Sequence, residues 1–297
     1  MLNSDRRVLA VLGCALVALS GLGAGQPKHV LFLGFDGLTP RAVERVDTPN
    51  FDRLKREGSW TYASRSILPS SSACNWRSIF TCSASEQHGF NDWNTRTPVV
   101  RPSVTLASGL YPDLFAVLRA QRPEATSAFL YDWIGMPFTV DTNACSLVRR
   151  ACGNGRMTKA VCGLVAAGLP TFTAAVFGEP DGTGHKFGWD SPEYDACVAE
   201  LDACLGDILA ALEKAGVASE TVIIVSSDHG GKDKKHGGAT LEEMERPLFV
   251  FGKGIRRGCH LAFGGTVYDT GATLAALLGL RPPREWIGRP LEEAFLN

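Results

Sequence analysis

The sequence lacks a charge excess of either sign. Its 30 lysine and arginine residues nearly balance 31 aspartate and glutamate residues, and the formal net charge is −1. This balance gives no bulk electrostatic case for a nucleic-acid-binding surface or a polybasic membrane contact. The sequence also lacks internal repeats, and past its N-terminus no apolar run is long enough to span a bilayer. With 45% hydrophobic residues, this is the composition of an ordinary globular protein.

Residues 1–25 have the layout of a secretory signal peptide. Two arginines precede an apolar run from Val8 to about Leu22, and small residues follow it. We expect cleavage near Ala24 or Gly25 and therefore a secreted or periplasmic protein without a membrane span in the mature chain. The alternative is an uncleaved helix that anchors the N-terminus in a membrane.

None of the cysteine spacings is typical of a zinc site. The sequence has nine cysteines, of which eight follow Cys14. In an exported chain an even number permits disulfides but does not determine their pairing. The cysteines at 145, 152 and 162 are the better candidates for a bridge, whereas Cys197 and Cys204 also fit small core residues of a helix.

Three aspartates each end an apolar, β-branched or aromatic run. The runs are HVLFLGFDG, TFTAAVFGEPDG and TVIIVSSDHG, and the acids are Asp36, Asp181 and Asp228. Such short apolar runs are typical of buried strands in a parallel sheet. Ligands bind beyond the carboxyl ends of these strands, so the three acids together indicate one site. Each acid alone is more simply explained as a turn residue or a helix cap.

Helical patterns lie between these runs. In the clearest one, Ser191 is the expected N-cap, Pro192 the first helical residue and Gly216 the stop. Strands that alternate with helices predict an α/β fold, with a mostly parallel central sheet and helices on both faces. We expect a single catalytic domain over residues 26–297, with a small irregular insertion within about 95–162.

Histidines lie close to two of the three acids. His185 follows Asp181, while His229 and His236 follow Asp228. Carboxylate, imidazole and hydroxyl groups are zinc ligands, and a two-metal site needs about seven of them. Together with Asp36, these residues provide six possible ligands. One ligand, a hydroxyl group, is still missing.

A serine run before an expected helix can supply this hydroxyl. In SILPSSSACNWRSIFTC, Pro69 and three serines precede a helical segment from Ala73 onward. The free N–H groups and positive dipole end of a helix N-terminus stabilise an alkoxide or a bound phosphate, and a metal ion does so directly. Without the acids and histidines, a plain N-cap serine is the simpler explanation.

These segments resemble the alkaline phosphatase superfamily, most closely its type I phosphodiesterase/nucleotide pyrophosphatase family. GFDGLTPRAVERVDTPNFDRLKREGSW is similar to the family's opening strand, metal aspartate and following helix. LPSSSACNW resembles its nucleophile segment, and EPDGTGHKFG resembles one of its metal motifs. SDHGG…HGG with EEMERPLFVFGKGI resembles the closing motif of the superfamily. The resemblance runs from about residue 28 to residue 292.

The resemblance implies a site with two zinc ions and a serine nucleophile. Ser72 would attack phosphorus and form a covalent intermediate, which activated water would then release. The first zinc would be held by Asp181, His185 and His236, and the second by Asp36, Ser72, Asp228 and His229.

The sequence departs from the family pattern around the nucleophile. Serine stands where the family usually has threonine, Cys74 replaces proline and Trp76 replaces histidine. We expect Asn91, in preference to Asn94, to bind the phosphoryl oxygen. Trp76 and Trp133 are expected to line the substrate pocket, with core packing as an equal alternative for each.

The expected function is exported, zinc-dependent hydrolysis of phosphodiester or pyrophosphate bonds in a small-molecule phosphate ester. A phosphomonoesterase is the main alternative. A sulfatase fits less well, because SACNWR lacks the proline and the spacing of the sulfatase motif CxPxR. An inactive binding protein also fits less well, because all seven ligand positions are filled. The patterns predict no particular oligomeric state.

Overall fold

A computed structural model describes residues 25–296 of the chain. Nearly all of the expected signal peptide, residues 1–24, lies outside the described residues. The described part forms an eight-stranded sheet in the order β4-β3-β5-β1-β6-β7-β2-β8. The strands are β1 (His29–Phe35), β2 (Ser59–Arg65), β3 (Ser127–Tyr131), β4 (Leu147–Arg150), β5 (Phe172–Phe177), β6 (Thr221–Ser226), β7 (Glu245–Gly252) and β8 (Cys259–His260).

The sheet is mostly parallel, as predicted. Five neighbouring strand pairs are parallel, and only β7 runs antiparallel to its neighbours β6 and β2. The three strands whose sequences end in aspartates occupy adjacent central positions, in the order β5-β1-β6. Their parallel direction therefore brings the three carboxyl ends to one edge of the sheet.

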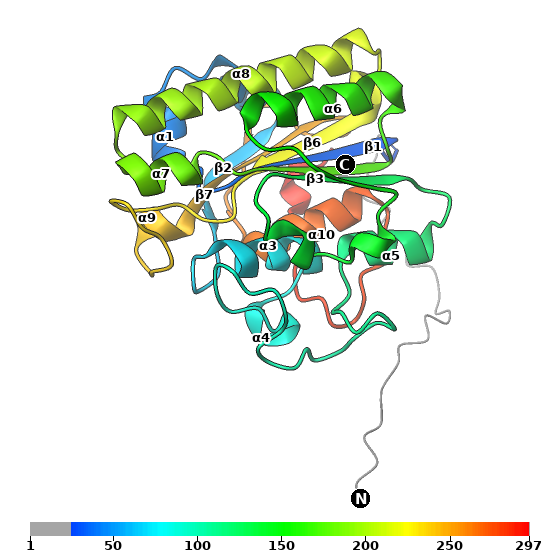
Figure 1. Cartoon of the computed structure of the whole chain (residues 1–297). Helices are drawn as coiled ribbons and strands as arrows, with labels where there is room; N and C mark the ends of the chain where they lie inside the picture. The colour runs from blue at the N-terminus through cyan, green and yellow to red at the C-terminus, as the bar shows by residue number, and fades with distance from the viewer. Residues whose placement is uncertain (1–24, 297) are drawn as a thin grey trace, which may run out of the picture.

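Helices cover both faces of the sheet, which confirms the predicted α/β fold (Figure 1). The helices are α1 (Pro40–Arg45), α2 (Pro49–Glu57), α3 (Ser72–Thr81), α4 (Ser85–His88), α5 (Leu114–Gln121), α6 (Asn154–Gly168), α7 (Asp181–Phe187), α8 (Pro192–Lys214), α9 (Leu241–Met244) and α10 (Val267–Leu277). Short 3₁₀ turns cover Met136–Phe138, Thr142–Ala144, Ala218–Glu220 and Glu292–Ala294. No helix within residues 25–296 is long and apolar enough to cross a membrane.

Strand β1 shows why the molecule has a hydrophobic core on each side of the sheet. Successive side chains of a strand point to opposite faces. Leu31 and Leu33 belong to the core under α6 and α8, whereas Val30 and Phe32 belong to the core that includes residues of α3, α5 and α10. The strand is buried on both faces, which explains its nearly continuous apolar sequence.

Helix α8 begins and ends as its sequence predicts. The hydroxyl of Ser191 accepts a hydrogen bond from the Tyr194 amide at 3.2 Å, and Pro192 is the first helical residue. The helix ends at Lys214, two residues before Gly216, which has a φ of 70°. A glycine adopts this left-handed conformation without the strain that a Cβ would cause.

The segment from 95 to 162 contributes to the main sheet as well as to its surface. Residues 95–113 hold no helix or named strand, whereas β3, β4 and the first part of α6 come from the remainder. All eight described cysteines are free thiols, so the bridge expected among positions 145, 152 and 162 does not form in this structure.

Candidate active site

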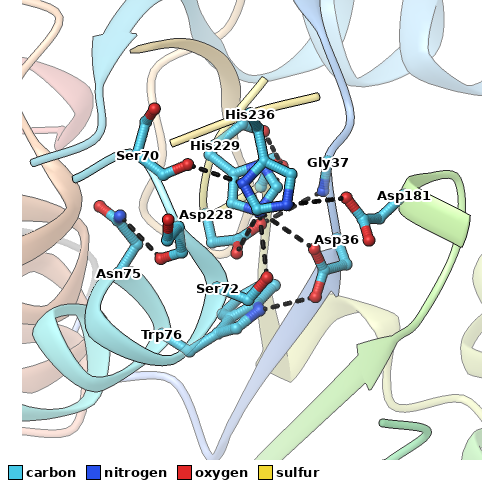
Figure 2. Close-up of polar contacts among 12 residues, drawn as sticks. Asp36, Gly37, Ser70, Ser72, Asn75, Trp76, Asp181, Asp228, His229 and His236 are labelled. Carbon is cyan, nitrogen blue, oxygen red and sulfur yellow. Dashed lines mark hydrogen bonds and ion pairs between the residues drawn. The ribbon is translucent and has the colours of Figure 1, made fainter. Parts of the chain in front are cut away.

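The three aspartates predicted from the strand ends converge at one edge of the sheet (Figure 2). Asp36 follows β1 directly, Asp181 begins α7 after β5, and Asp228 lies two residues beyond β6. The Asp181 amide donates to the carbonyl of Asp36 at 2.9 Å, and the Gly37 amide donates to Asp228 Oδ1 at 3.2 Å. Backbone hydrogen bonds thus hold the carboxylates close together.

Each of these aspartates has one buried oxygen without a hydrogen-bond partner in the described structure: Asp36 Oδ1, Asp181 Oδ1 and Asp228 Oδ2. Burial raises the pKa of Asp181 and of Asp228 to about 7. Burial, together with repulsion from the other two carboxylates, raises the pKa of Asp36 well above its usual range. Unpaired carboxylates at this density are costly in free energy unless a cation compensates them.

Three histidines face the carboxylates in one common orientation. The Nδ1 atoms of His185, His229 and His236 lie 3.0, 2.8 and 2.9 Å from the backbone carbonyls of Lys234, Gly230 and Ser70. A carbonyl only accepts, so Nδ1 carries the proton and Nε2 keeps its lone pair. This is how a ligating imidazole is oriented in a metal site.

The Nε2 atoms point toward the acids. His185 Nε2 lies 3.5 Å from Asp181 Oδ2, and His236 Nε2 lies 3.6 Å from Asp181 Oδ1. His229 Nε2 lies 3.2 Å from Asp228 Oδ2. Burial lowers the pKa of His229 and of His236 to about 3, so both imidazoles are neutral at physiological pH. Neutral imidazoles and unpaired carboxylates are the donors that zinc binds.

Two groups of these side chains could hold a metal ion. One group is Asp181, His185 and His236, and the other is Asp36, Asp181 and His229; within each group the ligand atoms lie within 4.8 Å of one another. The first group coincides with the set inferred from the sequence. The second shares Asp36 and His229 with the expected set but contains Asp181 in place of Asp228, so the Asp181 carboxylate faces both positions. The residues present therefore fit divalent cations.

Ser72 lies at the start of the buried helix α3, beside the carboxylates. Its Oγ is 3.1 Å from His229 Nε2, and because Nδ1 of this imidazole carries the proton, the serine hydroxyl donates. The preceding loop is held by Asn75, a residue that the sequence did not single out. Its amide accepts from the Ile67 amide at 2.8 Å and donates to the Pro69 and Ser71 carbonyls, both at 2.9 Å.

Trp76 lies beneath the site and not in the wall of the pocket. Its ring is fully buried, and its Nε1–H donates to Asp36 Oδ2 at 3.0 Å. A Cβ on Gly34 would come within 2.5 Å of this ring, so a glycine is required for the indole to reach Asp36. The expected substrate contact of Trp76 is thus replaced by a contact that orients a carboxylate.

A cavity of about 1060 Å³ opens next to Asp36, Ser72, Asp181, His185 and His236. Its outer wall includes Asp92, Trp93, Asp132, Trp133, Ile134, Arg150 and Glu179. Trp133 lines the cavity as expected, and its ring centroid lies 6.3 Å from that of Trp93.

Asn91 does not line this cavity. Its side chain is exposed, and its Oδ1 accepts from the Thr95 hydroxyl at 3.5 Å. The next two residues, Asp92 and Trp93, line the cavity instead. Phosphoryl binding by Asn91 would therefore require the loop to move. The sequence places the loop near the nucleophile but cannot decide which of its side chains faces the cavity.

Comparisons with known proteins identify the family of this chain. A family model described as type I phosphodiesterase/nucleotide pyrophosphatase matches residues 30–285. Human ectonucleotide pyrophosphatase/phosphodiesterase family member 7 is 27% identical over 266 residues, covering 81% of this chain and 58% of that protein. Human arylsulfatase K is 31% identical over 113 residues, covering 35% of this chain and 21% of that protein. The chain thus spans little more than half the length of the first of these relatives.

Solved structures share the fold. Human ectonucleotide pyrophosphatase/phosphodiesterase 5 superposes with a TM-score of 0.74 at 14% identity, covering 91% of this chain and 100% of that chain. The inactive murine protein in complex with AMP has a TM-score of 0.71 at 16% identity, covering 87% and 96%. A 2-O GAG sulfatase has a TM-score of 0.70 at 14% identity, covering 90% and 73%. Because the family model spans residues 30–285, the chain belongs to the type I phosphodiesterase/nucleotide pyrophosphatase family of the alkaline phosphatase superfamily.

Proposed function

We propose that this chain is an exported, metal-dependent hydrolase of phosphodiester or pyrophosphate bonds, with Ser72 as its nucleophile. One observation carries the proposal: unpaired carboxylate oxygens and oriented imidazole nitrogens converge on a serine hydroxyl at a helix start. Membership of the family supports this class of reaction. Export rests on the signal-peptide pattern of residues 1–25 and agrees with the names of the ectonucleotide relatives.

In this proposal two zinc ions are the cofactors. Bound zinc would supply Lewis acidity, which lowers the pKa of a ligating hydroxyl group and offsets the charge of a phosphoryl group. The ligands of one ion would be Asp181, His185 and His236, and those of the other would be Asp36, Ser72, Asp228 and His229.

Ser72 performs the covalent chemistry. The Ser72 hydroxyl gives its proton to solvent as its oxygen attacks phosphorus, and the bond between phosphorus and the leaving oxygen breaks with its electron pair on that oxygen, which takes up a proton. A water molecule then attacks phosphorus and loses a proton, and the Oγ–P bond breaks with its electron pair on Oγ. Reprotonation of Oγ restores the hydroxyl, and a phosphate monoester is released when the substrate is a diester. The 3.1 Å contact with His229 Nε2 places the Ser72 oxygen beside an atom that would ligate the same ion.

The cavity allows a substrate the size of a nucleotide. Its volume of about 1060 Å³ is at the upper end of the range for small-molecule sites. Trp93 and Trp133 present aromatic surface on its wall. The AMP complex of the murine relative supports the inclusion of nucleotide esters among the substrates of this chain.

A sulfatase that uses the nearby cysteine is less consistent with the geometry. The Cys74 side chain is fully buried, and its sulfur lies 3.2 and 3.1 Å from the carbonyls of Pro69 and Ser71. The thiol therefore points into backbone, whereas Ser72 borders the cavity.

The test is a paired assay with aryl esters of one leaving group: a phosphodiester, a phosphomonoester and a sulfate. We expect the purified protein to cleave the diester fastest, to lose activity in chelator and to regain it with zinc. An equal or faster monoesterase would replace the diesterase assignment, and faster sulfate cleavage would replace it by a sulfatase. Absence of zinc binding and of all three activities would favour a binding protein.

A further inference from the structure

Arg246, the second residue of β7, is fully buried behind the candidate active site. Its guanidinium contacts four oxygen atoms. Nη1 donates to Ser226 Oγ at 2.6 Å and to the Ser227 carbonyl at 2.9 Å. Nη2 donates to Thr270 Oγ1 at 2.7 Å, and Nε donates to the Arg65 carbonyl at 3.3 Å. One side chain therefore ties the ends of β6 and β2 to α10.

The contact with Ser227 lies where regular strand pairing stops. Strand β6 pairs with β7 as far as Ser226, which lies opposite Leu248. The chain then leaves the sheet, and the Ser227 carbonyl is the first acceptor beyond the paired segment. Arg246 binds this carbonyl from the neighbouring strand. The Arg246 side chain thus holds the turn that begins at Ser227, beyond the last backbone pairing between β6 and β7.

The turn held in this way carries two candidate metal ligands. Ser227 Oγ donates to the His229 carbonyl at 2.8 Å, so the carbonyl end and the side chain of this serine are both restrained. Asp228 lies between them with its Oδ2 unpaired and 3.2 Å from His229 Nε2. A shift of Ser227 would be transmitted directly to both ligand atoms.

The charge of Arg246 is unusual for a group with a purely structural role. Within residues 25–296 it forms hydrogen bonds only to carbonyl and hydroxyl oxygens, and the attractive charges that act on it are those of Asp228 and Asp269. Burying an arginine without an ion-pair partner is unfavourable in free energy, because the charged group loses its hydration. Part of this cost is offset because the guanidinium lies close behind an acidic site.

We propose that Arg246 is a positioning residue that fixes the Ser226–His229 turn, so that Asp228 and His229 present their ligand atoms to a metal ion. This role rests on the proposed metal-dependent function. It concerns one of the two metal positions, since Asp181 and His185 come from another segment and His236, seven residues beyond His229, is oriented by the Ser70 carbonyl.

The test compares Arg246→Lys with a matched control, Arg77→Lys. Arg77 is also fully buried and binds carbonyls, those of Thr139 at 2.8 Å and Tyr111 at 3.2 Å, but it does not touch the Ser226–His229 turn. A lysine retains the charge but cannot reach all the acceptors of a planar guanidinium. Both substitutions should therefore lower the melting temperature, and only the first should disturb the site.

Two readouts separate positioning from stability. Native mass spectrometry and zinc titration should show that Arg246→Lys loses one of two ions or binds it at least about tenfold more weakly, as for residues that orient ligands. In chelated protein, amide exchange over residues 226–231 should be at least about tenfold faster than in wild type. Arg77→Lys should match wild type in both measurements.

The exchange measurement also keeps this inference distinct from the proposed function. If the wild-type protein bound no metal, the proposed function would fail, while exchange in the metal-free chain would still decide whether Arg246 holds the turn. Unchanged exchange and unchanged zinc affinity in Arg246→Lys would overturn the inference. Equal effects in Arg77→Lys would overturn it as well.

A milder variant covers the case in which Arg246→Lys does not fold. Thr270→Val preserves shape and removes the acceptor of Nη2, together with a long hydrogen bond of 3.4 Å to the Thr266 carbonyl. We expect it to fold and to show the same two changes at smaller amplitude, about twofold to fivefold. Wild-type exchange and zinc affinity in Thr270→Val, with Arg246→Lys unfolded, would count against the inference.

Discussion

The hydroxyl oxygen of Ser72 lies 3.1 Å from Nε2 of His229, although 157 positions separate the two residues in the sequence. Ser72 begins α3, and His229 follows the central strand β6. The contact joins the proposed nucleophile to a proposed metal ligand. It also means that displacement of either segment disturbs the other.

Substitution of Ser72 tests the proposed nucleophile. Ser72→Ala should reduce kcat by about 10³-fold or more, because no neighbouring hydroxyl occupies the same position. Ser72→Thr should retain measurable activity, since it keeps an attacking hydroxyl. Ser71→Ala is the matched control; this neighbouring serine borders the same cavity, and its side chain makes no cap hydrogen bond. A comparable loss of kcat in Ser71→Ala, or wild-type activity in Ser72→Ala, would contradict the assignment.

Trp76→Phe tests the support of Asp36. The substitution keeps an aromatic ring but removes the donor to Asp36 Oδ2, so we expect about 1–3 kcal/mol of destabilisation and zinc affinity about tenfold weaker. Trp286→Phe is the control, because Trp286 is also buried and donates its Nε1–H to the Pro112 carbonyl at 3.1 Å. Denaturant unfolding and zinc titration should show lower stability in both variants and weaker zinc binding in Trp76→Phe alone.

Asn75→Ala tests the loop before the nucleophile. Its amide group joins Ile67, Pro69 and Ser71, so its removal should lower kcat at least about tenfold as well as the melting temperature. In the control, Asn50→Ala, the lost side-chain bonds go to Asp202, far from the site in the chain. That variant should lose stability with unchanged kcat. Equal changes in kcat for the two variants would show that Asn75 has only a general structural role.

Proton release on zinc binding tests the electrostatics of the carboxylates. Burial raises the pKa of Asp181 and Asp228 to about 7 in the metal-free chain, so both are largely protonated at about pH 6 and ionised at about pH 8. Zinc must displace these protons at the lower pH, and its affinity should therefore rise as the pH increases from about 6 to about 8. His229 and His236, with a pKa of about 3, are neutral throughout this range.

Calorimetry in buffers of different ionisation enthalpy measures this release directly. We expect more protons to be released at about pH 6 than at about pH 8, because Asp181 and Asp228 ionise between these values. Asp202→Asn provides a control, since Asp202 accepts from the Asn50 and Phe51 amides and not from a residue of the site. It should leave the number of released protons unchanged. An equal number at both pH values would contradict the raised pKa of the two site carboxylates.

Much of the fold follows from local patterns. The apolar runs before Asp36 and Asp228 are long enough only for short strands, and Ser191 with Pro192 fixes the start of α8 through local hydrogen bonding and geometry. The sequence also predicts that the three aspartates converge, because parallel strands end at one edge of a sheet. These features depend on residues close in sequence or on a general rule of sheet topology.

The outer part of the site could not be predicted from local sequence patterns. Trp76 and Trp133 are both aromatic residues near predicted site segments, yet one is buried under Asp36 and the other lines the cavity. Asn91 is exposed, while Trp93, two residues later, borders the cavity. The direction of a side chain in an irregular loop depends on contacts with distant segments, which no local period encodes.

The sequence by itself determined the α/β class, the strand ends that carry the acids and the histidines that accompany them. Only the tertiary structure decided that each imidazole donates its Nδ1 proton to a carbonyl, that Asp181 faces both candidate metal positions, and that Arg246 holds the turn before Asp228. The reason is physical. Periodicity and chain direction depend on neighbouring residues, whereas ligand orientation depends on hydrogen bonds between segments that meet only in the folded chain.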